Sequence, residues 1–139
     1  EDSVGGVVTC VCEGLSAGLG EPVFDKLTAV MAHAMMSLPA TKGFQVHEGF
    51  SAAGMKGSEL NGIMHGVSGG ISTGNPLVFQ VAFKPASSIA REQTMKRADG
   101  QIIQQRIEGR HDPCVVPRAV PIVEAMAAMV LADMWMMRR

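Results

Sequence analysis

Two short segments of this 139-residue chain place a basic side chain among other polar groups. In the first, Lys84, Ser87 and Ser88 directly follow an apolar run that is typical of a strand. An ammonium group beside two hydroxyls and several loop amides can hold a phosphate by charge and hydrogen bonds. The alternative is a solvated strand end without a ligand, and the residue types leave both interpretations open.

The second segment is GRHDPC, residues 109–114. Its Arg110 can bind phosphate, and its His111 and Asp112 can together handle a proton. Equally, Asp112 can cap a local turn and Arg110 can pair with a surface carboxylate. The segment by itself does not choose between these roles.

A third segment, residues 66–74, is rich in glycine and carries Ser68, Ser72 and Thr73. Glycine lets a flat ligand approach the backbone closely. The phosphate-loop pattern GxxxxGK[ST] is absent, however, so a plain turn is the default expectation here.

The histidines and cysteines do not have the spacing of metal ligands. His33 falls among Met and Ala in a helical pattern, and His47 and His65 lack a partner at ligand spacing. Cys10 and Cys12 share one face of a strand, and no CxxC occurs. We therefore expect free, reduced thiols and no metal site.

Hydrophobic periodicity predicts the elements that position these segments. Leu27, Val30, Met31 and Ala34 recur at helical spacing and predict a helix over 23–37, with Pro22 in its first turn. A second helix from about Arg118 is apolar on nearly every face, so we expect it to be packed between other elements. Strands are predicted at 6–12, 44–47 and 77–83, with a hairpin of 93–97 and 101–107 around an Asp-Gly turn.

Residues 49–62 are polar and glycine-rich and are predicted to form a loose connection. The whole pattern indicates an α+β fold with glycine-rich loops between strands and two main helices. At 47% hydrophobic and 18% charged residues, the chain has the composition of one globular domain.

Charge and composition also exclude two kinds of partner. A net charge of −1, one Trp and no Tyr argue against nucleic acid. The uncharged apolar stretch 125–132 is too short to span a bilayer. The chain begins EDSVGGVV without an initiator Met, so we expect a piece of a longer chain.

Five blocks of sequence resemble chorismate synthase. They occur in that family's order and cover most of the chain: GLGEPVFDKL at 18–27, AMMSLPATKGF at 34–44, GGIS at 69–72, AFKPASSI at 82–89 and GRHDPCVVPRAVPIVEAMA at 109–127.

The resemblance implies a lyase of the shikimate pathway and aromatic amino acid biosynthesis. Such an enzyme converts 5-enolpyruvylshikimate 3-phosphate to chorismate and phosphate by an anti-1,4-elimination that requires reduced FMN. It also implies a β-α-β sandwich fold and a homotetramer. Some members carry an NADPH-dependent flavin reductase activity. The expected location is the cytoplasm, or a plastid if the parent chain has a transit peptide.

The resemblance also suggests roles for individual residues. Asp112 matches an aspartate proposed to handle the proton on the flavin. The implied flavin-binding residues are Ala40, Gly69, Lys84, Pro85, Ala86, Ser87, Ser88 and Arg110.

Two positions depart from the family pattern. Met64-His65-Gly66-Val67 stands where the family usually has Asn followed by AGGI, and Ala86 replaces the commoner Thr or Ile. The family's two catalytic histidines belong to its N-terminal half. Residues 1–139 are therefore expected to be the C-terminal portion, with the N-terminal half absent, and to be inactive alone. The alternative is a non-catalytic module that retains the fold for assembly or ligand binding.

Overall fold

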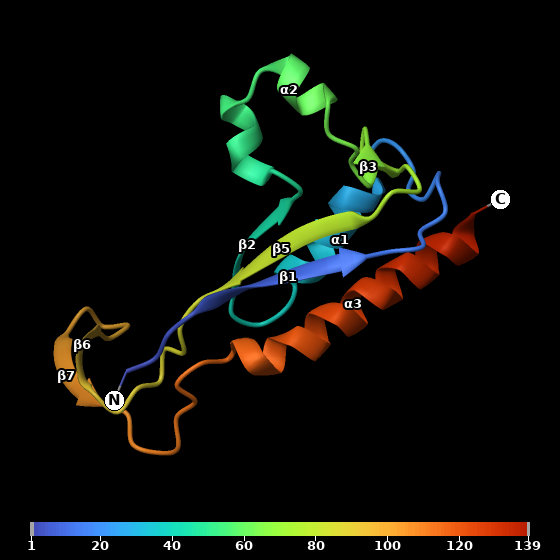
Figure 1. Cartoon of the computed structure of the whole chain (residues 1–139). Helices are drawn as coiled ribbons and strands as arrows, with labels where there is room; N and C mark the ends of the chain where they lie inside the picture. The colour runs from blue at the N-terminus through green and yellow to red at the C-terminus, as the bar shows by residue number, and fades with distance from the viewer. Residues whose placement is uncertain (1, 139) are drawn as a thin grey trace.

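A three-stranded antiparallel sheet with two helices on one face forms the centre of the molecule (Figure 1). The computed structural model describes residues 2–138. The strands are β1 (Gly6–Cys12), β2 (Thr41–Val46) and β5 (Leu77–Phe83), in the order β1-β5-β2. The helices α1 (Leu27–Met36) and α3 (Val116–Met137) pack on each other. Helix α1 also packs on β2, and α3 packs on β1.

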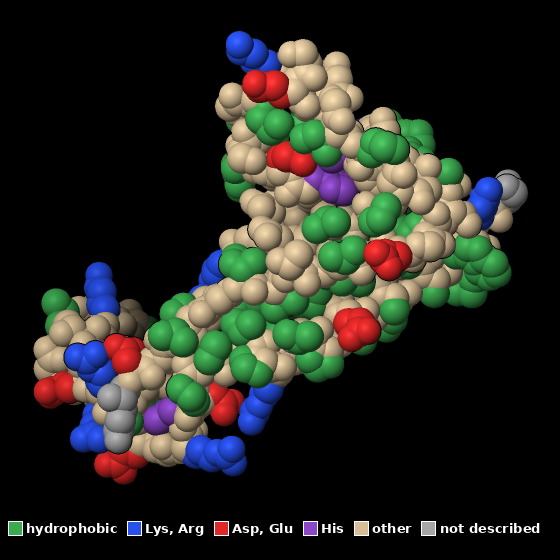
Figure 2. All heavy atoms as spheres, viewed as in Figure 1, with side chains coloured by type: hydrophobic (Ala, Val, Ile, Leu, Met, Phe, Trp, Pro, Cys, Tyr) green, Lys and Arg blue, Asp and Glu red, His purple; other side chains and the backbone are tan. Residues whose placement is uncertain are grey.

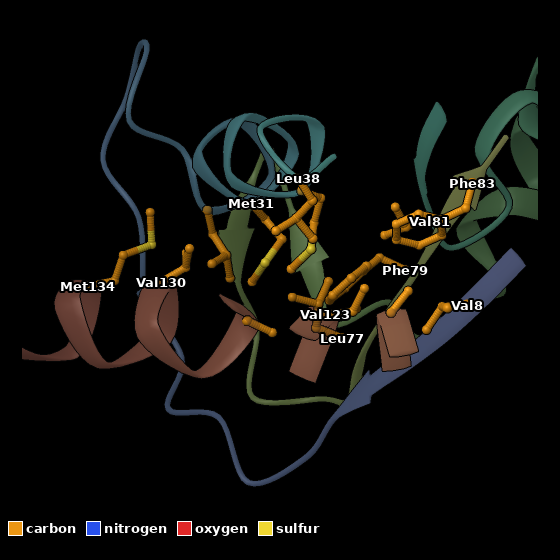
Figure 3. Close-up of a cluster of buried hydrophobic side chains, with 14 of the residues drawn as sticks. Val8, Met31, Leu38, Leu77, Phe79, Val81, Phe83, Val123, Val130 and Met134 are labelled. Carbon is orange, nitrogen blue, oxygen red and sulfur yellow. The ribbon is translucent and has the colours of Figure 1, made fainter. Parts of the chain in front are cut away.

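The central strand β5 carries the core. Its alternate residues Leu77, Phe79, Val81 and Phe83 are buried beneath the helices, as Figure 3 shows. The residues between them face the other side of the sheet, where Val7 and Val11 of β1 are more than half exposed. The bounds predicted for β1 and β5 are confirmed to the residue, because runs of β-branched and other apolar residues favour strands.

Helix α1 begins at Leu27, four residues later than predicted. Glu21 and Asp25 pair across a tight turn, where the Glu21 N–H donates to the Asp25 carbonyl at 2.9 Å. Pro22 therefore lies in this turn, and its predicted place in the first turn of the helix is wrong. The backbone pairing across the turn overrides the helical pattern of the residues that it encloses.

Helix α3 packs on one side only, which corrects the expectation of a helix enclosed by other elements. Figure 2 shows hydrophobic side chains gathered along it. Its buried stripe follows helical spacing and consists of Ala119, Val123, Ala127, Val130 and Met134. Its exposed large apolar residues are Val120, Ile122, Met129, Trp135, Met136 and Met137.

The length of α3 also changes the argument about membranes. With 22 residues and a mean hydropathy of 1.6 in its most apolar window, α3 is long and apolar enough to cross a bilayer. A core helix of a soluble protein passes the same test, so one such helix is weak evidence. Only 22% of that window is buried, through the stripe that packs against α1 and β1.

Two projections extend from the opposite ends of the sheet (Figure 1). One is an arm of a 3-10 helix, η1 (Gly49–Gly54), and α2 (Gly57–Asn61), followed by a small hairpin of β3 (Val67–Ser68) and β4 (Ile71–Ser72). The arm replaces the loose connection predicted there. Glu59 stabilises the start of α2 by accepting the Lys56 N–H at 2.8 Å.

The second projection is the hairpin of β6 (Glu92–Lys96) and β7 (Ile102–Arg106). It confirms the hairpin predicted from the Asp-Gly turn. Asp99 accepts the Gln101 N–H at 2.9 Å, and Gly100 adopts a φ of +89°, which favours glycine.

The cysteines are free thiols in the structure. Cys10 and Cys12 lie on the helix-facing side of β1 with their sulfur atoms 3.9 Å apart. Burial raises the pKa of the Cys10 thiol, and it raises the pKa of the Cys12 thiol to about 12. Both side chains therefore behave as small core residues at neutral pH.

Candidate functional site

The end of β5 holds the first predicted segment in a defined turn. The Lys84 N–H donates to the Ala40 carbonyl at 2.9 Å, and the Lys84 ammonium donates to the Ser87 hydroxyl at 2.6 Å. The Ala86 carbonyl accepts the Ser3 hydroxyl at 2.6 Å. Lys84 and Ser87 are exposed, so a cation and a hydroxyl are held side by side and open to solvent.

Ala40 connects this turn to an apolar hollow. It has a φ of +67°, a left-handed conformation that is uncommon outside glycine. The hollow measures about 190 Å³ and lies between the end of α1, the end of β5 and the start of α3. Its lining residues are Leu38, Pro39, Ala40, Phe83, Val115, Arg118, Ala119 and Ile122.

Asp112 lies beside this hollow because it pairs with Arg118. Its Oδ2 lies 2.9 Å from Nη1 of the Arg118 guanidinium in an ion pair, and its side chain is 34% exposed. The segment that carries it is fixed to the start of the chain, where the Val4 N–H donates to the Pro113 carbonyl at 2.8 Å. Asp112 therefore acts as an ion-pair partner rather than as the local cap that the sequence left open.

A second hollow lies on the other side of Asp112. It measures about 390 Å³ and is lined by Asp2, Ile89, Ala90, Gly109, His111, Asp112 and Pro113. The His111 ring lies 3.0 Å from the Ile107 carbonyl, which holds it within the segment. His111 and Asp112, the pair that the sequence suggests for handling a proton, therefore both line this hollow.

The predicted flavin residues fall into three groups. Ala40 and the turn that includes Pro85 and Ser88 gather at the end of β5. Arg110 is exposed on the connection between β7 and α3. Gly69 lies in the turn between β3 and β4, close to the opposite end of β5, which is about 20 Å away at strand spacing.

Sequence reasoning missed Arg118. The sequence places it only at the approximate start of a helix. The spacing from Asp112 to Arg118 offers no signal, since the segment between them is neither a continuous helix nor a strand. Only the turn into α3 brings the two charges together.

Sequence reasoning also missed a polar cluster of His47, Glu48 and His65 at the other end of the sheet. The His65 Nε2 and the Glu48 carboxylate are 2.5 Å apart, and the two histidine rings meet edge to face with centroids 4.8 Å apart. Burial, with a smaller contribution from His65, lowers the pKa of His47. Its own backbone amide, and then His65, lower the pKa of Glu48.

The family model for chorismate synthase matches residues 1–136. The chain belongs to the chorismate synthase family. Among curated relatives, it is 53% identical over 146 residues to a chorismate synthase of Methylacidiphilum infernorum. It is 52% identical over 149 residues to that of Opitutus terrae. These alignments cover 95% and 97% of this chain but only 40% and 41% of the relatives.

The chain thus spans about two fifths of the length of the curated chorismate synthases that it matches. A solved structure described as a crystal structure of chorismate synthase matches with a TM-score of 0.72 at 29% identity. That match covers 95% of this chain and 37% of the solved one. The fold is α+β, as predicted, and it is shared with chorismate synthase.

Proposed function

We propose that this chain is the C-terminal portion of a chorismate synthase and supplies part of its flavin site. The complete enzyme would convert 5-enolpyruvylshikimate 3-phosphate to chorismate and phosphate. The observation that carries the proposal is the gathering of Lys84, Ser87, Ala40 and the Asp112–Arg118 pair at one end of β5. Family membership supports the same reaction.

The residues at this end fit FMN by the chemistry of their groups. A phosphate suits the exposed Lys84 ammonium and Ser87 hydroxyl, which are already 2.6 Å apart. An apolar ring suits the hollow beside Ala40, which adjoins the same turn. Reduced flavin, when bound, supplies transient electron density that promotes loss of the phosphate.

Within this site the Asp112 carboxylate can act as a proton acceptor at the edge of the apolar hollow. Arg118 fixes one carboxylate oxygen, which leaves the second oxygen to accept or return a proton. Arg110 adds a cation on the adjoining connection, which can bind a second anionic group. Gly69 joins the site only at the far end of a long ligand or from another copy of the chain in a homotetramer.

The decisive test is phosphate release from 5-enolpyruvylshikimate 3-phosphate with reduced FMN. We expect turnover by the complete gene product that contains this chain, and none by the 139-residue chain alone. The N-terminal half of the family provides the catalytic histidines. Turnover by the chain alone would overturn the assignment of those histidines to another segment.

Asp112→Asn in the complete gene product tests the catalytic assignment. We expect a fall in turnover of about 10²-fold or more, the usual contribution of a positioned proton-transfer group. Asp133→Asn, an exposed carboxylate of α3, is the matched control and should leave turnover unchanged. Unchanged turnover in Asp112→Asn removes this residue from the mechanism.

The alternative function is a non-catalytic module for assembly or ligand binding. Its support is the change at residues 64–67 and the large exposed apolar face of α3. A complete gene product that binds FMN but never releases phosphate would favour it. We also propose a cytoplasmic or plastid location. Whether NADPH reduces the flavin is decided by following NADPH oxidation with the same preparation.

A further inference from the structure

The cluster of His47, Glu48 and His65 lies at the root of the β3–β4 hairpin. His47 follows β2 and its N–H donates to the Val78 carbonyl of β5 at 2.9 Å. Its ring reaches across to the hairpin, where Nε2 accepts the Gly66 N–H at 3.2 Å. One residue therefore connects the sheet directly to Gly66, which immediately precedes β3.

His47 makes this contact from an unfavourable backbone conformation. Its φ of +51° lies in the left-handed region, where a residue with a Cβ is strained. The bond to Gly66 also requires an unprotonated Nε2, since a ring nitrogen that carries a proton cannot accept. The contact therefore exists only while the His47 ring is neutral.

His65 holds the hairpin from its other side. Its ring is hydrogen-bonded to Glu48, and its carbonyl accepts the Thr73 hydroxyl at 2.7 Å. The Thr73 N–H in turn donates to the Gly66 carbonyl at 2.9 Å, which closes the root of the hairpin. The two histidines thus hold both ends of residues 66–73.

The packing of Gly66 makes the connection rigid. Gly66 is buried, and a Cβ placed on it would meet the Pro76 carbonyl oxygen at 2.3 Å. The hairpin root therefore rests directly on the backbone that leads into β5. A change at His47 is transmitted to the hairpin because little free space separates them.

We propose that His47, Glu48 and His65 are positioning residues whose protonation sets the placement of the β3–β4 hairpin, and with it Gly69, on the sheet. The consequence for Gly69 as a flavin contact rests on the function proposed above. The placement of the hairpin does not depend on that function.

The charges around His47 give the direction of the effect. Burial and His65 lower its pKa, whereas Glu48 raises it, and β5 presents only a neutral carbonyl to it. Because the folded chain favours the neutral ring, the bond to Gly66 is fully present above about pH 6.5. It is lost as pH falls through the lowered pKa of folded His47.

Hydrogen exchange at the Gly66 amide of the complete gene product, followed by NMR, tests the placement. We expect protection to fall about fivefold to tenfold on acidification, after correction for intrinsic exchange, as one hydrogen bond is lost. Glu48→Gln should move the midpoint to lower pH, and His65→Gln should move it to higher pH. His33→Gln, on the exposed side of α1, is the control and should move nothing.

His47→Gly tests whether the His47 ring positions the hairpin or is only tolerated at a strained backbone position. Glycine relieves the strain at a φ of +51°, so a tolerated histidine predicts unchanged or stronger protection of Gly66. We expect instead a weakly protected amide without pH dependence. Protection that is the same at pH 5 and pH 7.5 in the unmodified chain, or equal midpoints in the two glutamine variants, would overturn the proposal.

FMN titration of the complete gene product across the same pH range then tests the consequence for Gly69. We expect affinity to fall on acidification in parallel with Gly66 protection, and the two glutamine variants to shift both curves together. An FMN affinity that ignores the Gly66 transition refutes the link to flavin. Absence of any FMN binding refutes the proposed function and leaves the exchange result standing.

Discussion

The two ends of the central sheet differ in how their polar groups are held. At the end of β5, Lys84 and Ser87 are exposed and Asp112 is fixed by a single ion pair. At its start, the contacts around Gly66, His65 and Ser72 are internal, and the Ser72 hydroxyl both accepts the Leu19 N–H and donates to the Ser16 carbonyl. The polar groups at the first end are exposed and can bind a ligand. Those at the second end form hydrogen bonds with the chain's own backbone.

Membership in one family therefore does not make its sequence blocks equivalent. The GGIS and AFKPASSI blocks flank the same strand, yet they emerge at opposite ends of it (Figure 1). A ligand that contacts both must be long, or the two contacts come from different copies.

Phe79→Ala should have the largest effect, because Phe79 is fully buried at the centre of the strand that joins both ends. We expect a loss of about 3–5 kcal/mol in the free energy of unfolding, measured by urea denaturation. Val11→Ala, which faces the open side of the sheet, is the control and should change it by about 0.5 kcal/mol or less. Loss of amide protection at one end only would show that the ends fold independently.

Gly66→Ala should lower the free energy of unfolding by about 1–3 kcal/mol, because the new Cβ would meet the Pro76 carbonyl oxygen at the start of β5 at 2.3 Å. Gly69→Ala is the matched comparison. Nothing lies within 4 Å of its Cβ, so its φ of +58° leaves a strain of only about 1 kcal/mol. Equal costs in thermal denaturation would mean that close packing does not brace this end.

Lys84→Met should leave stability almost unchanged and weaken FMN binding to the complete gene product by about tenfold or more. The reason is the loss of a charged hydrogen-bond donor to phosphate. Lys42→Met, an exposed lysine of β2, is the control. Equal affinity in both variants would show that the open end does not bind the phosphate.

Arg118→Ala should produce a small change in stability, about 1 kcal/mol or less, since the Arg118 side chain is 68% exposed in its pair with Asp112. Turnover of the complete gene product should fall by a larger factor than this loss of stability explains. Arg118→Lys should restore part of the turnover. A large loss of stability, with turnover unchanged, would show that the Asp112–Arg118 pair stabilises the fold, as the internal hydrogen bonds at the start of β5 do.

Much of the fold follows from local sequence. The apolar, β-branched runs of β1 and β5 and the Asp99-Gly100 turn fix their elements because the information lies within a few neighbouring residues. The start of α1 does not follow, since pairing of Glu21 with Asp25 overrides the helical pattern. The short helices of the arm at 49–61 do not follow either, because glycine disfavours helices. Capping by Glu59 allows α2 to form in spite of its glycines.

For the candidate site, the sequence by itself determined family membership and the turn at Lys84 and Ser87, whose partners are three residues apart. The meeting of Arg118 with Asp112, and of His47 with His65, follows only from how the chain packs in three dimensions. The physical reason is that these relations depend on where separate segments leave one sheet. Residue types and spacing do not encode that direction; the packing of α1, α3 and the hairpins around β5 sets it.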